Sequence, residues 1–283
     1  MKKIFLFCLM SVFLNAENIV SVSIPPQAFF VQKIAANTLK INTLIEQNAD
    51  EHTFELKPSS MKELEKSDIY FTIGLEFEKA FSPKFKENFK NLNFVDMQKN
   101  IELKDFEEHF HEEHAHEGEH EEQKDIHTWL NPLLVKTMAT TIFEALVQKY
   151  PQNKALYEKN WEKFLKELDA LDFQIKTEFK DIKQKEFIVY HPSWGYFASA
   201  YGLEQIPVEI EAKEPKIKDL QRLIKFAKEK NIKVIFVQPG FPENAAKTLA
   251  KECGANIISI NHLAFDWENE LKKSAKILAD SLK

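Results

Sequence analysis

Short runs rich in Ile, Val and Phe alternate along the chain with longer stretches in which apolar residues recur every three or four positions. The first pattern predicts buried β-strands, and the second predicts helices that pack on a sheet. Strands are expected at residues 19–24, 41–45, 69–73, 93–96, 187–190, 205–210, 234–237 and 257–260. Because alternating strands and helices are typical of parallel sheets, we predict an α/β fold.

A stretch without glycine or proline separates the two sets of strands and runs from residue 152 to about residue 180. Its apolar positions follow helical spacing and predict one continuous helix. Such a helix is roughly 42 Å long at 1.5 Å per residue, which is more than one small lobe needs. We therefore predict two α/β lobes with parallel-sheet cores, at residues 17–150 and 183–283, joined by one long rigid helix at residues 151–182.

The first residues have the layout of a secretory signal peptide. Two lysines precede an apolar run at residues 4–14, and a polar stretch containing the small residue Ala16 follows. We predict that residues 1–16 are a signal peptide cleaved after Ala16, because the apolar run is too short to span a bilayer. Cys8 lies inside the run with no small residue before it, so no lipidation is expected. The mature chain is expected in the periplasm.

Composition narrows the classes of partner. The formal net charge of −6 becomes −8 when the two lysines of the signal peptide are removed, and Arg222 is the only arginine. A nucleic-acid groove needs clustered arginine and lysine, so this composition favours cations over nucleic acid as partners. After cleavage Cys253 is the only cysteine, which excludes a cysteine-rich zinc site and an internal disulfide.

Three histidines, His52, His127 and His191, stand at similar positions in the predicted fold. Each lies where a strand or a loop gives way to a helix, and open α/β sheets bind their ligands at such junctions. Neutral imidazole is a good zinc ligand, and three imidazoles leave the fourth position of a tetrahedral site open. Spacing alone does not separate such a site from ordinary core or surface histidines.

The sequences around these histidines resemble those of a known family. The segments EHTFELKP (51–58), HTWLNP (127–132) and YHPSWGYF (190–197) are similar to the three ligand motifs of the metal-binding proteins of zinc and manganese ABC importers. The resemblance extends over essentially the whole mature chain and implies one metal ligand from the histidine of each motif. Manganese-type members tend to have a carboxylate in the third motif and Mn²⁺ prefers oxygen, so His191 indicates a zinc-type member.

The resemblance implies transport rather than catalysis. A solute-binding protein of this family captures Zn²⁺ as its transported ligand and delivers it to an ABC permease with a cytoplasmic ATPase. We expect a monomer that is not an enzyme. Some relatives are linked to cell adhesion, but an adhesin role fits a soluble, unlipidated chain poorly. Two alternatives stay open: a manganese- or iron-binding protein of the same family, and a zinc hydrolase with Glu51 as general base. None of the predicted helices carries a His-Glu-x-x-His motif to support the hydrolase.

The fourth metal ligand is the point where this sequence departs from the family pattern. Many members have an aspartate just after the last strand, and Asn261, a poor zinc ligand, stands there in this chain. Glu51, adjacent to His52, and water are equal candidates for the fourth position. Asp266 and His262 are weaker candidates, and His262 is expected to face solvent.

A segment rich in histidine and acidic residues lies at residues 106–125. Its acidic side chains repel one another and aliphatic residues are nearly absent, so no packed structure is expected. We predict an accessory site that binds metal weakly, because clustered neutral imidazoles bind metal ions readily. The alternative is a solvated acidic insertion whose histidines are incidental. The accessory histidines are His109, His111, His114, His116 and His120.

Deletion of residues 107–122 is expected to leave a tight zinc site intact and to lower the total number of zinc ions bound. The deletion removes only the weak imidazole ligands of the accessory segment. Equilibrium dialysis of the mature protein and the deletion variant measures both quantities. Loss of all tight binding in the deletion variant would contradict the prediction.

Overall fold

Two four-stranded parallel sheets form the framework of the chain, which the computed structural model describes at residues 17–106, 124–210 and 213–283. The first sheet has the order β2-β1-β3-β4, with β1 (Ile19–Val22), β2 (Lys40–Thr43), β3 (Ile69–Thr72) and β4 (Asn93–Asp96). The second has the order β6-β5-β7-β8, with β5 (Glu186–Val189), β6 (Glu204–Pro207), β7 (Val234–Val237) and β8 (Asn256–Ser259). The predicted α/β fold is confirmed, whereas the predicted signal peptide and the five accessory histidines lie outside the described residues.

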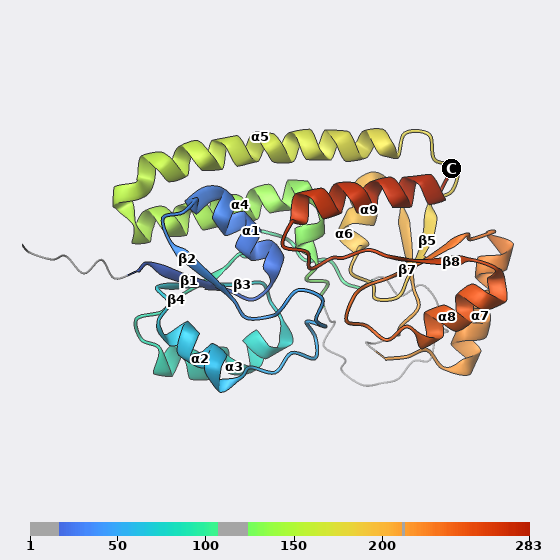
Figure 1. The fold of residues 1–283 in the computed structure, drawn as a ribbon, viewed down its shortest axis with the longest axis horizontal. Helices are drawn as coiled ribbons and strands as arrows, with labels where there is room; N and C mark the ends of the chain where they lie inside the picture. Colours follow the sequence, from blue (N-terminus) through green and yellow to red (C-terminus); the bar gives the residue numbers. More distant parts are fainter. Residues whose placement is uncertain (1–16, 107–123, 211–212) are drawn as a thin grey trace, which may run out of the picture.

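Helices cover both faces of each sheet (Figure 1). The first lobe contains α1 (Pro25–Ala35), α2 (Pro58–Glu65), α3 (Glu76–Asn88) and α4 (Pro132–Lys149). The second contains α6 (Gly195–Tyr201), α7 (Ile217–Glu229), α8 (Asn244–Cys253) and α9 (Trp267–Ser281). Two-sided cover explains why the central strands are apolar runs, since Val20 and Val22 of β1 and Ile69 and Phe71 of β3 are fully buried.

One long helix, α5 (Lys154–Glu178), runs above both lobes (Figure 1). It packs on α1 and α4 of the first lobe and on α9 of the second. Its buried face carries Tyr157, Phe164, Leu168, Leu171 and Ile175, which follow helical spacing. The predicted long connecting helix is therefore present and contacts both lobes along its length.

The end of the chain returns to the first lobe through α9. The indole of Trp267 packs edge-to-face on Phe30 of α1 with ring centroids 4.9 Å apart. Its Nε1–H donates a hydrogen bond to the carbonyl oxygen of Trp129, at 2.8 Å. One cluster of buried apolar residues consequently includes side chains from both lobes and from α5. The two lobes are therefore joined by a shared packed core.

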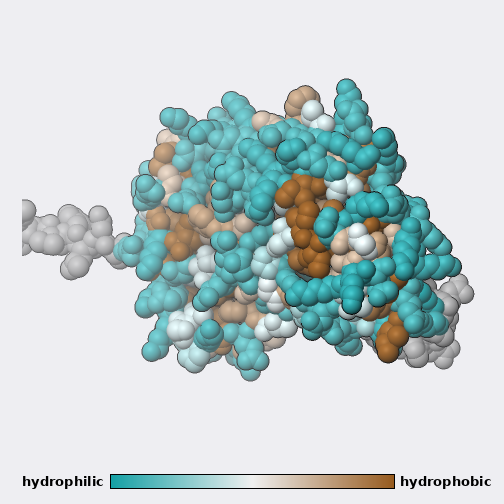
Figure 2. Space-filling view, turned by 45° about the vertical axis from the view of Figure 1, so that its right-hand side comes forward, coloured by the Kyte–Doolittle hydropathy of each residue, from teal (hydrophilic) through white to brown (hydrophobic). Residues whose placement is uncertain are grey.

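No helix in the part of the chain that the structure describes is both long and apolar enough to cross a bilayer. The face seen in Figure 2 is largely hydrophilic, and its hydrophobic residues gather in a few separate places. Phe173 and Ile217 are the most exposed of the large apolar side chains in the described residues, and single exposed apolar residues are usual on protein surfaces.

Leu168→Ala in α5 is expected to lower the free energy of unfolding by about 2–5 kcal/mol, because the substitution leaves a cavity in the shared core. Leu168 is 1% exposed. Leu156→Ala in the same helix is the matched control, since Leu156 is 40% exposed and should lose roughly 0.5 kcal/mol or less. Chemical denaturation measures both. Equal losses for the two variants would show that α5 does not depend on this packing.

Candidate metal centre

Loops at the carboxyl ends of the strands carry the predicted ligands. His52 lies in the loop between β2 and α2, His127 precedes the 3₁₀ turn Thr128–Leu130 that leads into α4, and His191 follows β5. Ligand sites of open parallel sheets lie outside the carboxyl ends of their strands. The three histidines therefore meet where the two lobes face each other.

The ligand atoms of four residues converge. The Nε2 atom of His191 lies 3.2 Å from His52 Nε2 and 3.1 Å from His127 Nε2. Oε1 of Glu51 lies 3.5 Å from His127 Nε2 and 4.0 Å from His52 Nε2. All four ligand atoms lie within 4.8 Å of one another. In tetrahedral coordination, zinc–ligand bonds of about 2.0–2.2 Å place the ligand atoms roughly 3.3–3.6 Å apart. The arrangement therefore fits a small cation with tetrahedral coordination.

A carboxylate lies behind each of the three imidazoles. Hydrogen bonding at Nδ1 orients the ring and leaves Nε2 directed at the shared centre, which is the arrangement typical of metal-binding histidines. The contacts are His52 Nδ1 to Glu76 Oε1 (3.2 Å), His127 Nδ1 to Asp125 Oδ1 (2.8 Å) and His191 Nδ1 to Glu209 Oε1 (2.6 Å).

Sequence reasoning did not identify these three carboxylates as partners of the histidines. Asp125 stands two residues before His127, and this short spacing was a signal that could have identified it. Glu76 and Glu209 are 24 and 18 residues away from their histidines, and no local pattern connects residues at such separations.

The expectation that His262 faces solvent is wrong. Its side chain is buried, and its Nε2 lies 2.7 Å from Oε1 of Glu51. The adjacent Asn261 is directed elsewhere, because its amide donates to Asn48 Oδ1 at 2.9 Å and its own Oδ1 accepts from the backbone N–H of Leu263. Of the weaker candidates near the last strand, His262 thus lies against Glu51 beside the centre, whereas Asp266 is exposed and accepts from Asn269.

Burial and neighbouring charges shift the pKa values of the buried site residues in different directions. Burial acts to lower the pKa of His127, but its hydrogen bonds with Asp125 and Glu51 outweigh burial and raise that pKa to about 9. Burial, followed by the charges of His127 and His52, holds the pKa of His191 well below its usual value. Burial acts to raise the pKa of Glu51, yet its interactions with His262 and His127 hold that pKa well below the ordinary value.

The centre is closed to large molecules. The side chain of His52 is 13% exposed, whereas those of Glu51 and His127 are fully buried. The ring of Phe241 stacks on His191 with centroids 4.5 Å apart. Of the four converging residues, His52 is the one that is not buried.

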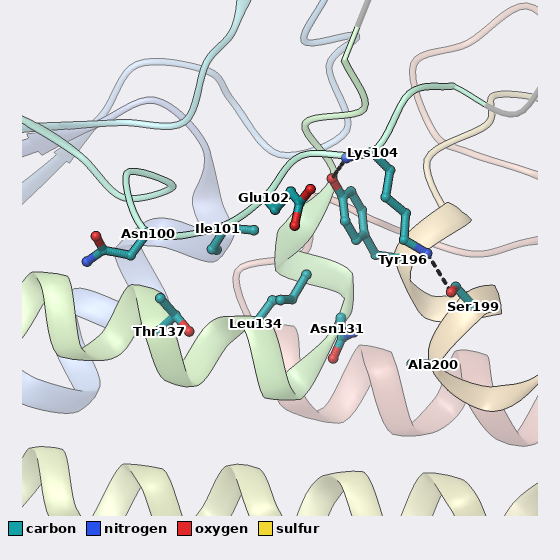
Figure 3. Close-up of a pocket in the computed structure, with 10 residues that line it drawn as sticks. All are labelled: Asn100, Ile101, Glu102, Lys104, Asn131, Leu134, Thr137, Tyr196, Ser199 and Ala200. Atoms are coloured by element: carbon teal, nitrogen blue, oxygen red, sulfur yellow. Dashed lines mark hydrogen bonds between the residues drawn. The ribbon is translucent and has the colours of Figure 1, made fainter.

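A separate crevice lies between α4 and α6, and none of the four converging residues lines it (Figure 3). Within this crevice the hydroxyl of Tyr196 accepts from the backbone N–H of Lys104 and donates to the carbonyl oxygen of Asp125, at 2.8 and 2.9 Å. Tyr196 of the second lobe thereby contacts the residue whose carboxylate orients His127.

Comparison with known proteins gives consistent matches. The family described as zinc-uptake complex component A, periplasmic (ZnuA), matches residues 20–277. The chain is 32% identical to the high-affinity zinc uptake system protein ZnuA of Bacillus subtilis (strain 168) over 243 residues, which are 84% of this chain and 76% of that protein. It is 28% identical to the zinc-binding protein AdcA of Streptococcus pyogenes over 256 residues, 86% of this chain but only 50% of AdcA.

Solved structures share the fold. The crystal structure of a ZnuA protein has a TM-score of 0.87 and 35% identity, with 94% of this chain and 100% of that chain covered. A zinc-bound deletion mutant of ZnuA has a TM-score of 0.85 and 35% identity, with 94% and 98% covered. The laminin-binding protein Lmb of Streptococcus agalactiae, at 22% identity and a TM-score of 0.82 with 94% and 100% covered, shows the fold alone.

Cation binding at this centre is expected to release at least one proton at neutral pH, because an imidazole must lose its Nε2 proton before it coordinates a metal. His127 carries such a proton at pH 7, since its pKa is about 9. Burial acts to lower the pKa of His52, but its hydrogen bond with Glu76 raises that pKa above its usual value. The apparent zinc affinity should therefore fall as the pH is lowered below about 9. Calorimetric titration with zinc at pH 7, in two buffers with different ionisation enthalpies, measures the release. Identical heats in both buffers would contradict the prediction.

Proposed function

The chain belongs to the family of periplasmic zinc-uptake component A proteins, and on this premise we propose that it captures Zn²⁺ between its two lobes and delivers it to an ABC importer permease. The observation that carries the proposal is the convergence of Glu51, His52, His127 and His191 within 4.8 Å. We propose these four residues as the ligands of the transported ion. The permease and its cytoplasmic ATPase are the proposed partners.

The composition of the donor set supports zinc over manganese or iron as the cargo. Three imidazole nitrogens and one carboxylate oxygen suit Zn²⁺, whereas Mn²⁺ prefers sites made mostly of oxygen. The relative from Bacillus subtilis is named for zinc uptake, and AdcA is named for zinc binding. These names agree with the chemistry of the four side chains.

The geometry also favours transport over hydrolysis. A hydrolytic zinc site must admit a substrate beside an activated water molecule. Here Oε1 of Glu51 is engaged by His262 at 2.7 Å, and Phe241 covers the ring of His191. A general base at Glu51 would need both freedom from that contact and room for a substrate.

Release follows from the distribution of ligands between the lobes. Glu51, His52 and His127 belong to the first lobe, and His191 belongs to the second. The continuous helix α5 and the shared core resist a large hinge motion, so we propose a small separation of the lobes that moves His191 away from the others. The permease would drive this separation when it binds both lobes.

A zinc titration of residues 17–283 against a chromophoric chelator is expected to reveal one tight site, with a change in tryptophan emission. The indole of Trp129 has its ring centroid 5.1 Å from that of His127 and should respond to occupancy. A variant with His52, His127 and His191 changed to alanine should lose the tight site and the emission change. Equally tight binding by that variant would refute the proposed ligands.

Two further measurements extend this titration. A variant with His109, His114 and His120 changed to alanine removes the same number of imidazoles and should keep the tight site. Competition of bound zinc against excess Mn²⁺ and Fe²⁺ tests the cargo. Displacement of zinc by a modest excess of Mn²⁺ would favour the manganese alternative, because zinc should win at a site of nitrogen donors.

A further inference from the structure

The carboxylate of Glu51 has an unusual position for a charged group. Its side chain is fully buried, and a buried carboxylate is unfavourable unless it is paired. Oε1 has two close neighbours, His262 Nε2 at 2.7 Å and His127 Nε2 at 3.5 Å. Oε2 has no hydrogen-bond partner among the described residues. The contact with His262 is therefore the shortest interaction that holds this side chain in place.

The segment that carries His262 contacts both lobes. The residue follows β8 of the second lobe, and its backbone carbonyl oxygen accepts a hydrogen bond from Trp129 Nε1 of the first lobe, at 2.8 Å. Its Nδ1 is buried and has no partner among the described residues. A carboxylate oxygen only accepts hydrogen bonds, so the short contact places an N–H on Nε2, which donates to Oε1 of Glu51.

We propose that His262 is a positioning residue that holds Glu51 as the fourth ligand of the zinc ion. The inference rests on the proposed function and deepens it, because it selects Glu51 over water at the position that the sequence left open. A carboxylate oxygen has two lone pairs, so Oε1 can accept the N–H of His262 and still face the centre between the three imidazoles. Without His262 the Glu51 side chain is free to leave, and water takes the fourth position.

The test is a double-mutant cycle on zinc affinity with Glu51→Gln, His262→Ala and the combined variant. Loss of a residue that orients a metal ligand typically weakens metal binding by about 10–100-fold, and His262→Ala should fall in this range. If His262 acts only through Glu51, the combined variant should bind no more weakly than Glu51→Gln alone.

The absorption spectrum of bound Co²⁺ depends on the donor atoms and the geometry of the site. The spectrum would therefore stay unchanged if His262 only stabilised the fold. His262→Ala should give the spectrum of Glu51→Gln rather than that of the wild type. His262→Gln, whose amide can donate in place of Nε2–H, should retain more affinity and a spectrum close to the wild type. This variant also decides the question if His262→Ala does not fold.

Asn48→Gly is the matched control. It removes the neighbouring contact between lobes, from Asn261 to Asn48, at a backbone φ of +68° that glycine adopts readily. The Co²⁺ spectrum of this variant should equal that of the wild type.

Additive losses in the cycle, or a wild-type Co²⁺ spectrum in His262→Ala, would overturn the inference and leave the proposed function standing. Failure of the wild-type protein to bind zinc at one tight site would instead overturn the proposed function.

Discussion

Donor atoms from two lobes can meet within 4.8 Å only while the lobes keep a fixed relative position, and helix packing provides that constraint. The helix α5 packs on α1, α4 and α9, so both lobes are attached to one rod. Trp267, at the start of α9, packs on Phe30 and donates to the carbonyl oxygen of Trp129. Because Trp129 lies two residues after His127, the contact that joins the lobes also fixes the segment that carries a candidate ligand.

Carboxylates behind the imidazoles decide what the centre can bind. Nε2 atoms 3.1–3.2 Å apart cannot all carry protons, because like charges repel strongly at this distance in a buried site. Asp125 and Glu209 lie at the Nδ1 atoms of His127 and His191, so each of these rings can keep a proton at Nδ1, on the side away from the centre. Once His127 has released its Nε2 proton, the lone pairs of Nε2 face a common point, and a small cation that accepts nitrogen ligands satisfies them.

The positions of the candidate ligands could be predicted from the sequence because they depend on local pattern. His191 follows a strand, and His127 precedes a helix with proline at its first position, so chain order places both at the carboxyl ends of strands. Glu209 and Glu76 reach their histidines only through tertiary folding. The prediction for His262 failed for a related reason: Asn261 uses its side chain in hydrogen bonds to Asn48 and Leu263, and no sequence pattern shows that the next ring turns inward.

A rigid connection between the lobes is compatible with release of the ion, because coordination is short-ranged. Zinc–nitrogen bonds are about 2.0–2.1 Å long, so a separation of roughly 1 Å at the centre removes a ligand without bending α5. His191 is suited to move in this way. Its backbone N–H donates to Gln238 Oε1, and its carbonyl oxygen accepts from Gln238 Nε2, so the residue is fastened to the loop after β7. His191 is therefore attached to the second sheet, and in the proposed release mechanism a small tilt of that sheet would be sufficient to break the site.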